Sequence, residues 1–219
     1  MYTDTHRDYV IRPILTEIIS ATCNCAGKTT IANKALEIIE ETTREEGCHC
    51  LGLDLDVAIP QWMKDNFSKG IYPTLKQRQE VALTFCDYVE LCCQEARQQK
   101  HNENTKLGAL VSFSFVNTDL RDIFRERFHH ARWVLVDTSA ELADERISQR
   151  KGHFYGGKKA VKDEGGKPDD QKDVDNSDWN FAPVTFPHDI LDGTEPVDIN
   201  AQRVSEIFRK SFQKQSNVK

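Results

Sequence analysis

The sequence predicts an α/β fold of three layers, in which helices cover both faces of a five-stranded parallel sheet. Short apolar segments without polar alternation recur along the 219-residue chain, a pattern typical of strands buried on both faces of a parallel sheet. A longer segment with apolar residues at helical spacing follows most of them. Alternating strands and helices form a parallel sheet, because each helix returns the chain to start the next strand.

The expected elements cover most of the chain. The strands are expected at residues 14–19, 48–55, 107–113, 133–137 and 197–199. The helices are expected at residues 29–46, 75–99, 118–128, 140–151 and 201–212. Gly47 can end the first helix, because glycine adopts the left-handed C-cap conformation at little cost, and Thr118 is a suitable N-cap.

One segment interrupts this rhythm. Residues 156–180 are rich in Gly, Lys and Asp and hold almost no aliphatic side chains, so they bury too little apolar surface to order well. The sheet is expected to resume after them. We therefore predict a single domain over residues 1–219, with a mobile lid at about 152–182.

Composition excludes several classes of partner. The chain carries 29 Lys and Arg against 35 Asp and Glu, a net charge of −6, which argues against nucleic acids and anionic membranes. No apolar run reaches the roughly 18–20 residues of a membrane span. The N-terminus lacks the regions of a signal peptide, so a cytoplasmic protein is expected.

The seven cysteines are expected to be free thiols, because their number is odd and no signal peptide is present. Cys23 with Cys25 and Cys48 with Cys50 suggest a zinc site. The first pair would follow one strand and the second would begin the next, so a strand length would separate them. A shared zinc site is therefore not expected.

The segment Ala26-Gly27-Lys28-Thr29-Thr30 carries the clearest chemical signal. It lies between the first expected strand and the first expected helix, which is the layout of a phosphate-binding loop, or P-loop. N–H groups at the helix start bind phosphate, Lys28 neutralises charge, and the Thr29 hydroxyl reaches Mg²⁺. Thr22 stands where the full pattern has its first glycine. The alternative is a segment that only starts a helix.

Asp54 and Asp56 come at the carboxyl end of the second expected strand, the edge of an α/β sheet where ligands bind. A spacing of two along a strand puts both side chains on one face. One carboxylate can hold Mg²⁺, and the other can take the proton of a substrate hydroxyl that attacks the γ-phosphate. The alternative is an Asp pair that caps a turn.

Three arginines follow. Phosphoryl transfer spreads negative charge, which Arg121, Arg146 and Arg150 can stabilise. Arg146 and Arg150 are four apart on an expected helix and share a face. Residues 150–154 lead into the expected lid, a position suited to closure over a nucleotide. A solvated basic face is the alternative.

Three segments together resemble the gluconate kinases, within the shikimate-kinase-like P-loop kinases. They are Asn66–Leu75 with Arg78, Ser112–Ser114 with Leu120–Asp122, and Glu145-Arg146 with Arg150–Phe154. The run Asp54–Ile59 is similar to the Asp-x-Asp-x-x-Ile run of the shikimate kinases. The resemblance runs from about residue 14 to about residue 208. It implies a P-loop NTPase fold, a kinase activity that uses ATP and Mg²⁺, and a small acidic acceptor, with gluconate first.

The resemblance also implies roles for single residues. The residues expected to bind the nucleotide are Asn24, Ala26, Gly27, Lys28, Thr29, Thr30, Arg146 and Arg150. Thr29 and Asp54 hold the metal, Asp56 is the base and faces the substrate, and Lys28 and Arg150 act in catalysis. Arg78, Arg121 and His153 bind the acidic substrate, since guanidinium groups pair with carboxylates. A homodimer through the helix at 75–99 is a family-level expectation.

Two rival hypotheses stay open. Thr22, Cys25 and Asn117 depart from the family's pattern, which favours a catalytically impaired relative that serves as a binding or regulatory protein. The other rival is a kinase for a different acceptor, such as shikimate.

Overall fold

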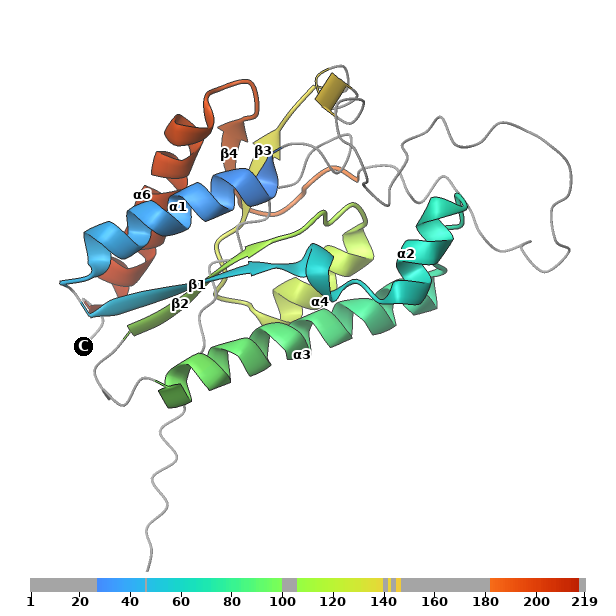
Figure 1. Ribbon diagram of the computed structural model, residues 1–219, viewed down its shortest axis with the longest axis horizontal. Helices are drawn as coiled ribbons and strands as arrows, with labels where there is room; N and C mark the ends of the chain where they lie inside the picture. The colour runs from blue at the N-terminus through green and yellow to red at the C-terminus, as the bar shows by residue number, and fades with distance from the viewer. Residues whose placement is uncertain are drawn as a thin grey trace, which may run out of the picture.

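Parallel strands flanked by helices make up the described part of the chain (Figure 1). The computed structural model describes residues 27–45, 47–99, 106–139, 142, 145–146 and 182–216. The strand expected at 14–19 and residues 152–181 of the expected lid lie outside these ranges. The α/β class and the parallel strand direction are confirmed, while the five-stranded sheet stays a prediction.

The described strands form two parallel pairs. β1 (Cys48–Asp54) pairs with β2 (Lys106–Ser112), with Cys48 opposite Lys106 and Asp54 opposite Ser112. β3 (Val134–Asp137) pairs with β4 (Asp189–Asp192). The expected strands at 48–55, 107–113 and 133–137 are therefore confirmed to within about one residue at each end.

The strand expected at 197–199 is wrong, because these residues form the first turn of helix α6 (Val197–Ser216). The N–H groups of Ile199 and Asn200 donate to the carbonyl of Pro196 at 3.1 and 3.2 Å, and Asp198 adds an acidic side chain to the first turn, where the helix dipole favours it. Val197 and Ile199 are 38% and 46% exposed. Neither is packed as a buried strand requires.

The other helices agree better with the sequence. α1 (Lys28–Thr43), α3 (Leu75–Gln99) and α4 (Thr118–Arg127) match their expected ranges closely. The 3-10 helix η1 (Leu55–Ala58) and helix α2 (Gln61–Ser68) were not expected. Asn117, not Thr118, is the N-cap of α4. Gly47 has φ of +63°, although the C-cap of α1 is Arg44.

Two apolar clusters lie on opposite faces of the strands and give the fold its three layers. Helices α1 and α6 bury one cluster, which includes Ile31, Leu110, Val136, Leu191 and Phe208. Helices α3 and α4 bury the other, which includes Phe85, Ala109, Val111, Phe124 and Trp133. Alternate residues of β2 thus enter opposite clusters, as the two-residue period of a strand requires. Both strand pairs contribute to both clusters, so they belong to one layer (Figure 1).

Candidate functional site

Helix α1 begins at the candidate phosphate-binding residues. Its N-cap, Gly27, has φ of +82°, a left-handed conformation that suits glycine and strains residues with a Cβ. The carbonyl of Gly27 accepts the N–H of Ile31 at 2.9 Å. Lys28 is buried at the first helical position. The first N–H groups of a helix have no partner within it, so this turn can bind an anion.

Thr29 and Asp54, the two predicted metal ligands, lie in contact. The Thr29 hydroxyl donates a hydrogen bond of 2.9 Å to Oδ2 of Asp54, across 25 residues of sequence. The second oxygen, Oδ1, accepts the N–H of Asp56 at 3.0 Å. The contact joins the first turn of α1 to the carboxyl end of β1. The carboxylate is therefore fixed from both sides.

The expectation that Asp54 and Asp56 share one face of a strand is wrong. β1 ends at Asp54, which serves as the N-cap of η1, and Asp56 lies within that 3-10 helix. An Asp side chain that accepts the N–H two residues later makes a local turn, and this turn ends the strand. Asp56 stays close to Thr29 and Asp54 through its backbone, and its predicted role as base stays a prediction.

Arg78 is buried on α3 and paired with a carboxylate of α4. Its Nε lies 3.2 Å from Oδ2 of Asp119, and its Nη1 donates to the carbonyl of Pro73 at 3.3 Å. Asp119 was not predicted as a site residue, because its only signal in the sequence is an acidic side chain in the first turn of an expected helix. The predicted binding of an acidic substrate by Arg78 therefore has to share the guanidinium with this ion pair.

Arg121 is the largest fully buried side chain among the described residues, at 1% exposure. Its guanidinium donates to four backbone carbonyls: Phe115 at 2.8 Å, Ala182 at 2.6 Å, Pro183 at 3.2 Å and Val116 at 3.3 Å. These bonds join the loop after β2 to the segment that begins at residue 182. The contacts give Arg121 a structural role, and substrate binding by this residue stays a prediction.

Arg146 contacts the loop that follows β4. Its Nη2 donates to the carbonyl of Gly193 at 2.9 Å. In the same turn Oδ1 of Asp192 accepts the hydroxyl and the N–H of Thr194 at 2.6 and 2.8 Å, and these bonds lower the pKa of Asp192. This loop was not predicted as part of the site, although Asp-Gly-Thr is a turn signal. The bond to Gly193 places Arg146 at the carboxyl edge of β4, where nucleotides bind in open α/β sheets.

Two polar atoms without a hydrogen-bond partner lie in the loops at this same edge. The hydroxyl oxygens of Ser114, after β2, and of Thr138, after β3, are both buried and have no partner in the described part of the chain. Such groups are rare in folded proteins and often belong to sites that a ligand completes. Ser114 belongs to a segment that carries the family resemblance, but no role was predicted for it, and Thr138 was not predicted as a site residue.

Several predicted site residues lie outside the described ranges: Asn24, Ala26, Arg150 and His153, together with Thr22 and Cys25. Their roles stay predictions. Thr30 is exposed on the first turn of α1, and Asn117 is buried at the start of α4.

The described cysteines are free thiols, as expected. These are Cys48, Cys50, Cys86, Cys92 and Cys93. Burial raises the pKa of Cys86 to about 12 and that of Cys93 to about 11, and it raises the pKa of Cys50 well above its usual value. In the described part of the chain, no group of three His, Cys, Asp or Glu side chains could hold a metal, and no helix there is long and apolar enough to cross a membrane.

No protein-family model and no curated protein matches the sequence, whereas solved structures match the fold. A sugar kinase from Janibacter sp. HTCC2649 superimposes with a TM-score of 0.61 at 17% identity, covering 91% of this chain and 95% of its own. A gluconokinase from Sinorhizobium meliloti 1021 gives 0.52 at 17% identity, over 94% and 100% of the two chains. The APS kinase of Mycobacterium tuberculosis, in complex with AMPPNP and APS, gives 0.52 at 14%, over 90% and 99%. The chain therefore has the fold of the P-loop kinases.

Proposed function

We propose that this protein is an ATP-dependent small-molecule kinase that transfers the γ-phosphate to a hydroxyl group of a polar, acidic metabolite. The contact between Thr29 and Asp54 carries the proposal. It joins the hydroxyl that follows the P-loop lysine to the carboxylate at the end of the neighbouring strand. P-loop NTPases hold Mg²⁺ with these two kinds of group.

The spacing of the pair suits Mg²⁺. Octahedral Mg²⁺ binds oxygen at about 2.0–2.1 Å, so neighbouring ligand oxygens lie roughly 2.8–3.0 Å apart. The oxygens of Thr29 and Asp54 are 2.9 Å apart. Mg²⁺ in phosphotransferases takes one or two protein ligands and completes its shell with water and substrate phosphates. The absence of a larger acidic cluster among the described residues therefore agrees with this use.

The remaining residues divide the chemistry between them. In the proposed mechanism Lys28 and the first turn of α1 bind the β- and γ-phosphates. The acceptor oxygen attacks the γ-phosphorus, the bond to the ADP oxygen breaks, and the acceptor proton passes to the Asp56 carboxylate. Mg²⁺ held by Thr29 and Asp54 would neutralise part of the phosphate charge. Arg146 contacts the nucleotide beside Gly193, and Arg150 and His153 act from the lid.

Gluconate is the first proposed acceptor, supported by the motif resemblance and by a gluconokinase among the structures with this fold. One observation favours a different acceptor. The guanidinium groups of Arg78 and Arg121, the two described candidates for binding an acidic substrate, already bond to protein groups. An acceptor that relies on hydroxyl contacts, for example to Ser114, would fit these contacts better.

We also propose that the segment at 14–19 is a fifth strand between β2 and β3. In the described residues β2 pairs with β1 alone and β3 with β4 alone, yet both pairs share both apolar clusters. Ala109, Leu110 and Val111 are completely buried on β2, as in a strand with neighbours on both sides. A strand at 14–19 would also lead directly into the P-loop.

Calorimetric titration with Mg·ATP tests the kinase proposal. Wild-type protein should bind, and Lys28→Ala should weaken binding roughly 10–100-fold, the effect of losing a charge-assisted hydrogen bond. Lys34→Ala is the matched control, since Lys34 is exposed on the same helix and paired with Glu37. No binding by wild-type protein, or equal effects of the two substitutions, would reject the proposed nucleotide site.

An ADP-release assay over sugar acids and related alcohols then identifies the acceptor. Turnover with gluconate supports the first choice, and turnover with shikimate alone rejects it. Binding of Mg·ATP without turnover on any acceptor would favour the impaired, regulatory relative. An Asp56→Ala variant with full turnover would reject Asp56 as the base.

A further inference from the structure

A cavity opens at the edge of the sheet opposite to Asp54. It has a volume of about 400 Å³, within the range of small-molecule sites. Arg132 and Trp133 come directly before β3, and Phe186 and His188 come just before β4. The cavity therefore lies at the amino ends of these parallel strands. Phosphate-binding residues lie at carboxyl ends, one strand length away, or roughly 13 Å for four residues.

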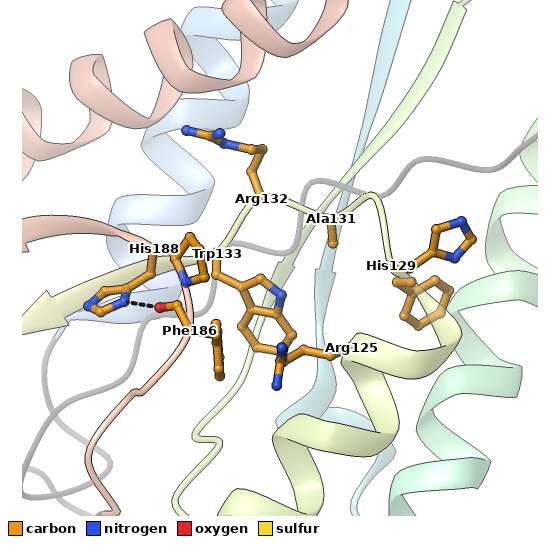
Figure 2. A pocket seen from close by; sticks show the side chains of 9 residues that line it. Arg125, His129, Ala131, Arg132, Trp133, Phe186 and His188 are labelled. Carbon is orange, nitrogen blue, oxygen red and sulfur yellow. Dashed lines mark hydrogen bonds between the residues drawn. The ribbon is translucent and has the colours of Figure 1, made fainter.

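The polar side chains that line the cavity are all basic. They are Arg125, His129, Arg132 and His188, and no Asp or Glu belongs to the lining. The lining thus presents two guanidinium groups and two imidazoles to a ligand, in a protein of net charge −6. Figure 2 shows Arg132 and His188 on one side of Trp133 and His129 on the other, with the Arg125 guanidinium close to the indole.

Both arginines keep donors for a ligand. Arg125 pairs with Asp122 at 3.1 Å and Arg132 with Asp189 at 3.0 Å, each through one terminal nitrogen. A guanidinium has five N–H donors in all. Exposed ion pairs of this kind contribute little free energy, so an anion in the cavity can compete with either carboxylate.

Aromatic contacts hold the basic groups in place. The guanidinium carbon of Arg125 lies 4.3 Å from the centre of the Phe186 ring, within the range of a cation–π interaction. Phe186 packs edge-on against Trp133 at 5.1 Å, and its carbonyl lies 2.8 Å from Nδ1 of His188 (Figure 2). A bond from an Nδ1–H fixes this ring and turns Nε2 away from the backbone. Arg125 and His188 are thus held in place before any ligand binds.

We propose that this cavity binds a small organic anion, a phosphate monoester or a carboxylate with an apolar part, at a site separate from the nucleotide site. The charged group contacts Arg125. Arg132, which points away from Arg125 in Figure 2 and whose side chain is 52% exposed, turns from Asp189 to the same group. The apolar part lies against Phe186 and Ala131. Such a ligand bridges the connection between α4 and β3 to the segment that leads into β4. Binding therefore stabilises the fold by mass action.

Calorimetric titration with phenyl phosphate and with benzoate tests the proposal, and benzyl alcohol serves as the uncharged analogue. Titrations use the Lys28→Ala variant beside the wild type, so that binding at the P-loop is recognised. At least one anion should bind both proteins with similar affinity, while benzyl alcohol binds at least tenfold more weakly. Replacing Arg125 and Arg132 together by Gln should weaken anion binding about 100-fold or more, about tenfold for each charge-assisted contact.

Arg127→Gln is the matched control, because Arg127 is exposed on the same helix but does not line the cavity. It should leave the affinity unchanged. Three outcomes would overturn the proposal: no binding of either anion at millimolar concentration, equal binding by the double variant, or loss of all binding in Lys28→Ala. A cooperative thermal unfolding transition shows that the double variant is folded. If it has none, single Arg125→Gln and Arg132→Gln variants replace it.

Discussion

Replacing Arg121 by Met tests whether this residue supports the fold or binds the substrate. Methionine fills the space of the aliphatic stem but donates no hydrogen bond, so four carbonyls lose a donor. The bond to Phe115 is buried, and leaving that carbonyl unsatisfied costs about 1–3 kcal/mol. The other three are partly buried, and the Val116 carbonyl keeps the N–H of Ala182 at 3.1 Å.

These contributions sum to a loss of about 3–5 kcal/mol in the free energy of unfolding, comparable to breaking a buried charged network. For a chain of this length the melting temperature should fall by roughly 6–20 °C. Thermal unfolding followed by circular dichroism measures the shift. Arg127→Met is the control on the same helix. It also loses three hydrogen bonds, but its side chain is 45% exposed, so about 1 kcal/mol or less is expected.

A melting temperature of Arg121→Met equal to that of the wild type would refute this reasoning. If the same variant also needed a much higher acceptor concentration for half-maximal turnover, the result would support the prediction that Arg121 binds the substrate. A variant that loses stability, but keeps its apparent affinity for the acceptor below its melting temperature, supports the structural role.

Three further predictions concern other parts of the fold. Gly193→Ala should lower the free energy of unfolding by about 1–3 kcal/mol, since the added Cβ would lie 2.6 Å from the backbone carbonyl of Asp137. Gly52→Ala should cost less than about 1 kcal/mol, because its Cβ meets only the side chain of Leu36. Equal melting temperatures for the two variants would contradict this. Cys86 and Cys93 should resist iodoacetamide at pH 8 until urea is added, since thiol pKa values of about 12 and 11 leave ~0.1% thiolate or less. Their contribution to the free energy of unfolding should fall as pH rises above the unfolded thiol pKa of about 8.5. Rapid labelling of these two cysteines in the native protein, measured by mass spectrometry, would contradict the raised pKa values. Thr29→Val should raise the Mg²⁺ concentration needed for ATP turnover at least tenfold, whereas Thr29→Ser should leave it nearly unchanged.

The sequence predicted the fold best where the pattern was long. The 25 residues of α3 show apolar residues at helical spacing over seven turns, so both ends were placed closely. The four residues of β4 gave no such signal, because only Leu191 is buried while Ile190 is 63% exposed. The Val-x-Ile pattern five residues later looked more strand-like. The proline before it, with its carbonyl positioned to accept two N–H groups, started a helix instead.

The candidate site was predicted unevenly for a similar reason. Contacts that follow from strand and helix ends, such as Thr29 with Asp54, can be foreseen, since parallel topology brings a helix start and a strand end to one edge. The role of Arg121 could not be foreseen. Its partners are backbone carbonyls up to 62 residues away, and carbonyls leave no trace in a sequence. A charged residue looks functional until its burial and its partners are known.

The proposed nucleotide site has two parts that can be tested separately: the pair Thr29 and Asp54, and the loop that contains Thr22. Thr29 and Asp54, the proposed metal ligands, are positioned by α1 and β1, which pack through Ile31, Ala35 and Cys50 in one apolar cluster. Thr22→Gly should therefore strengthen ATP binding and turnover, because glycine lets the loop backbone approach the phosphates, while the Mg²⁺ dependence stays that of the wild type. Steady-state kinetics at varied ATP and varied Mg²⁺ separate the two effects. A Thr22→Gly variant with an altered Mg²⁺ requirement and unaltered ATP affinity would show that the loop, not the packed elements, sets the metal site.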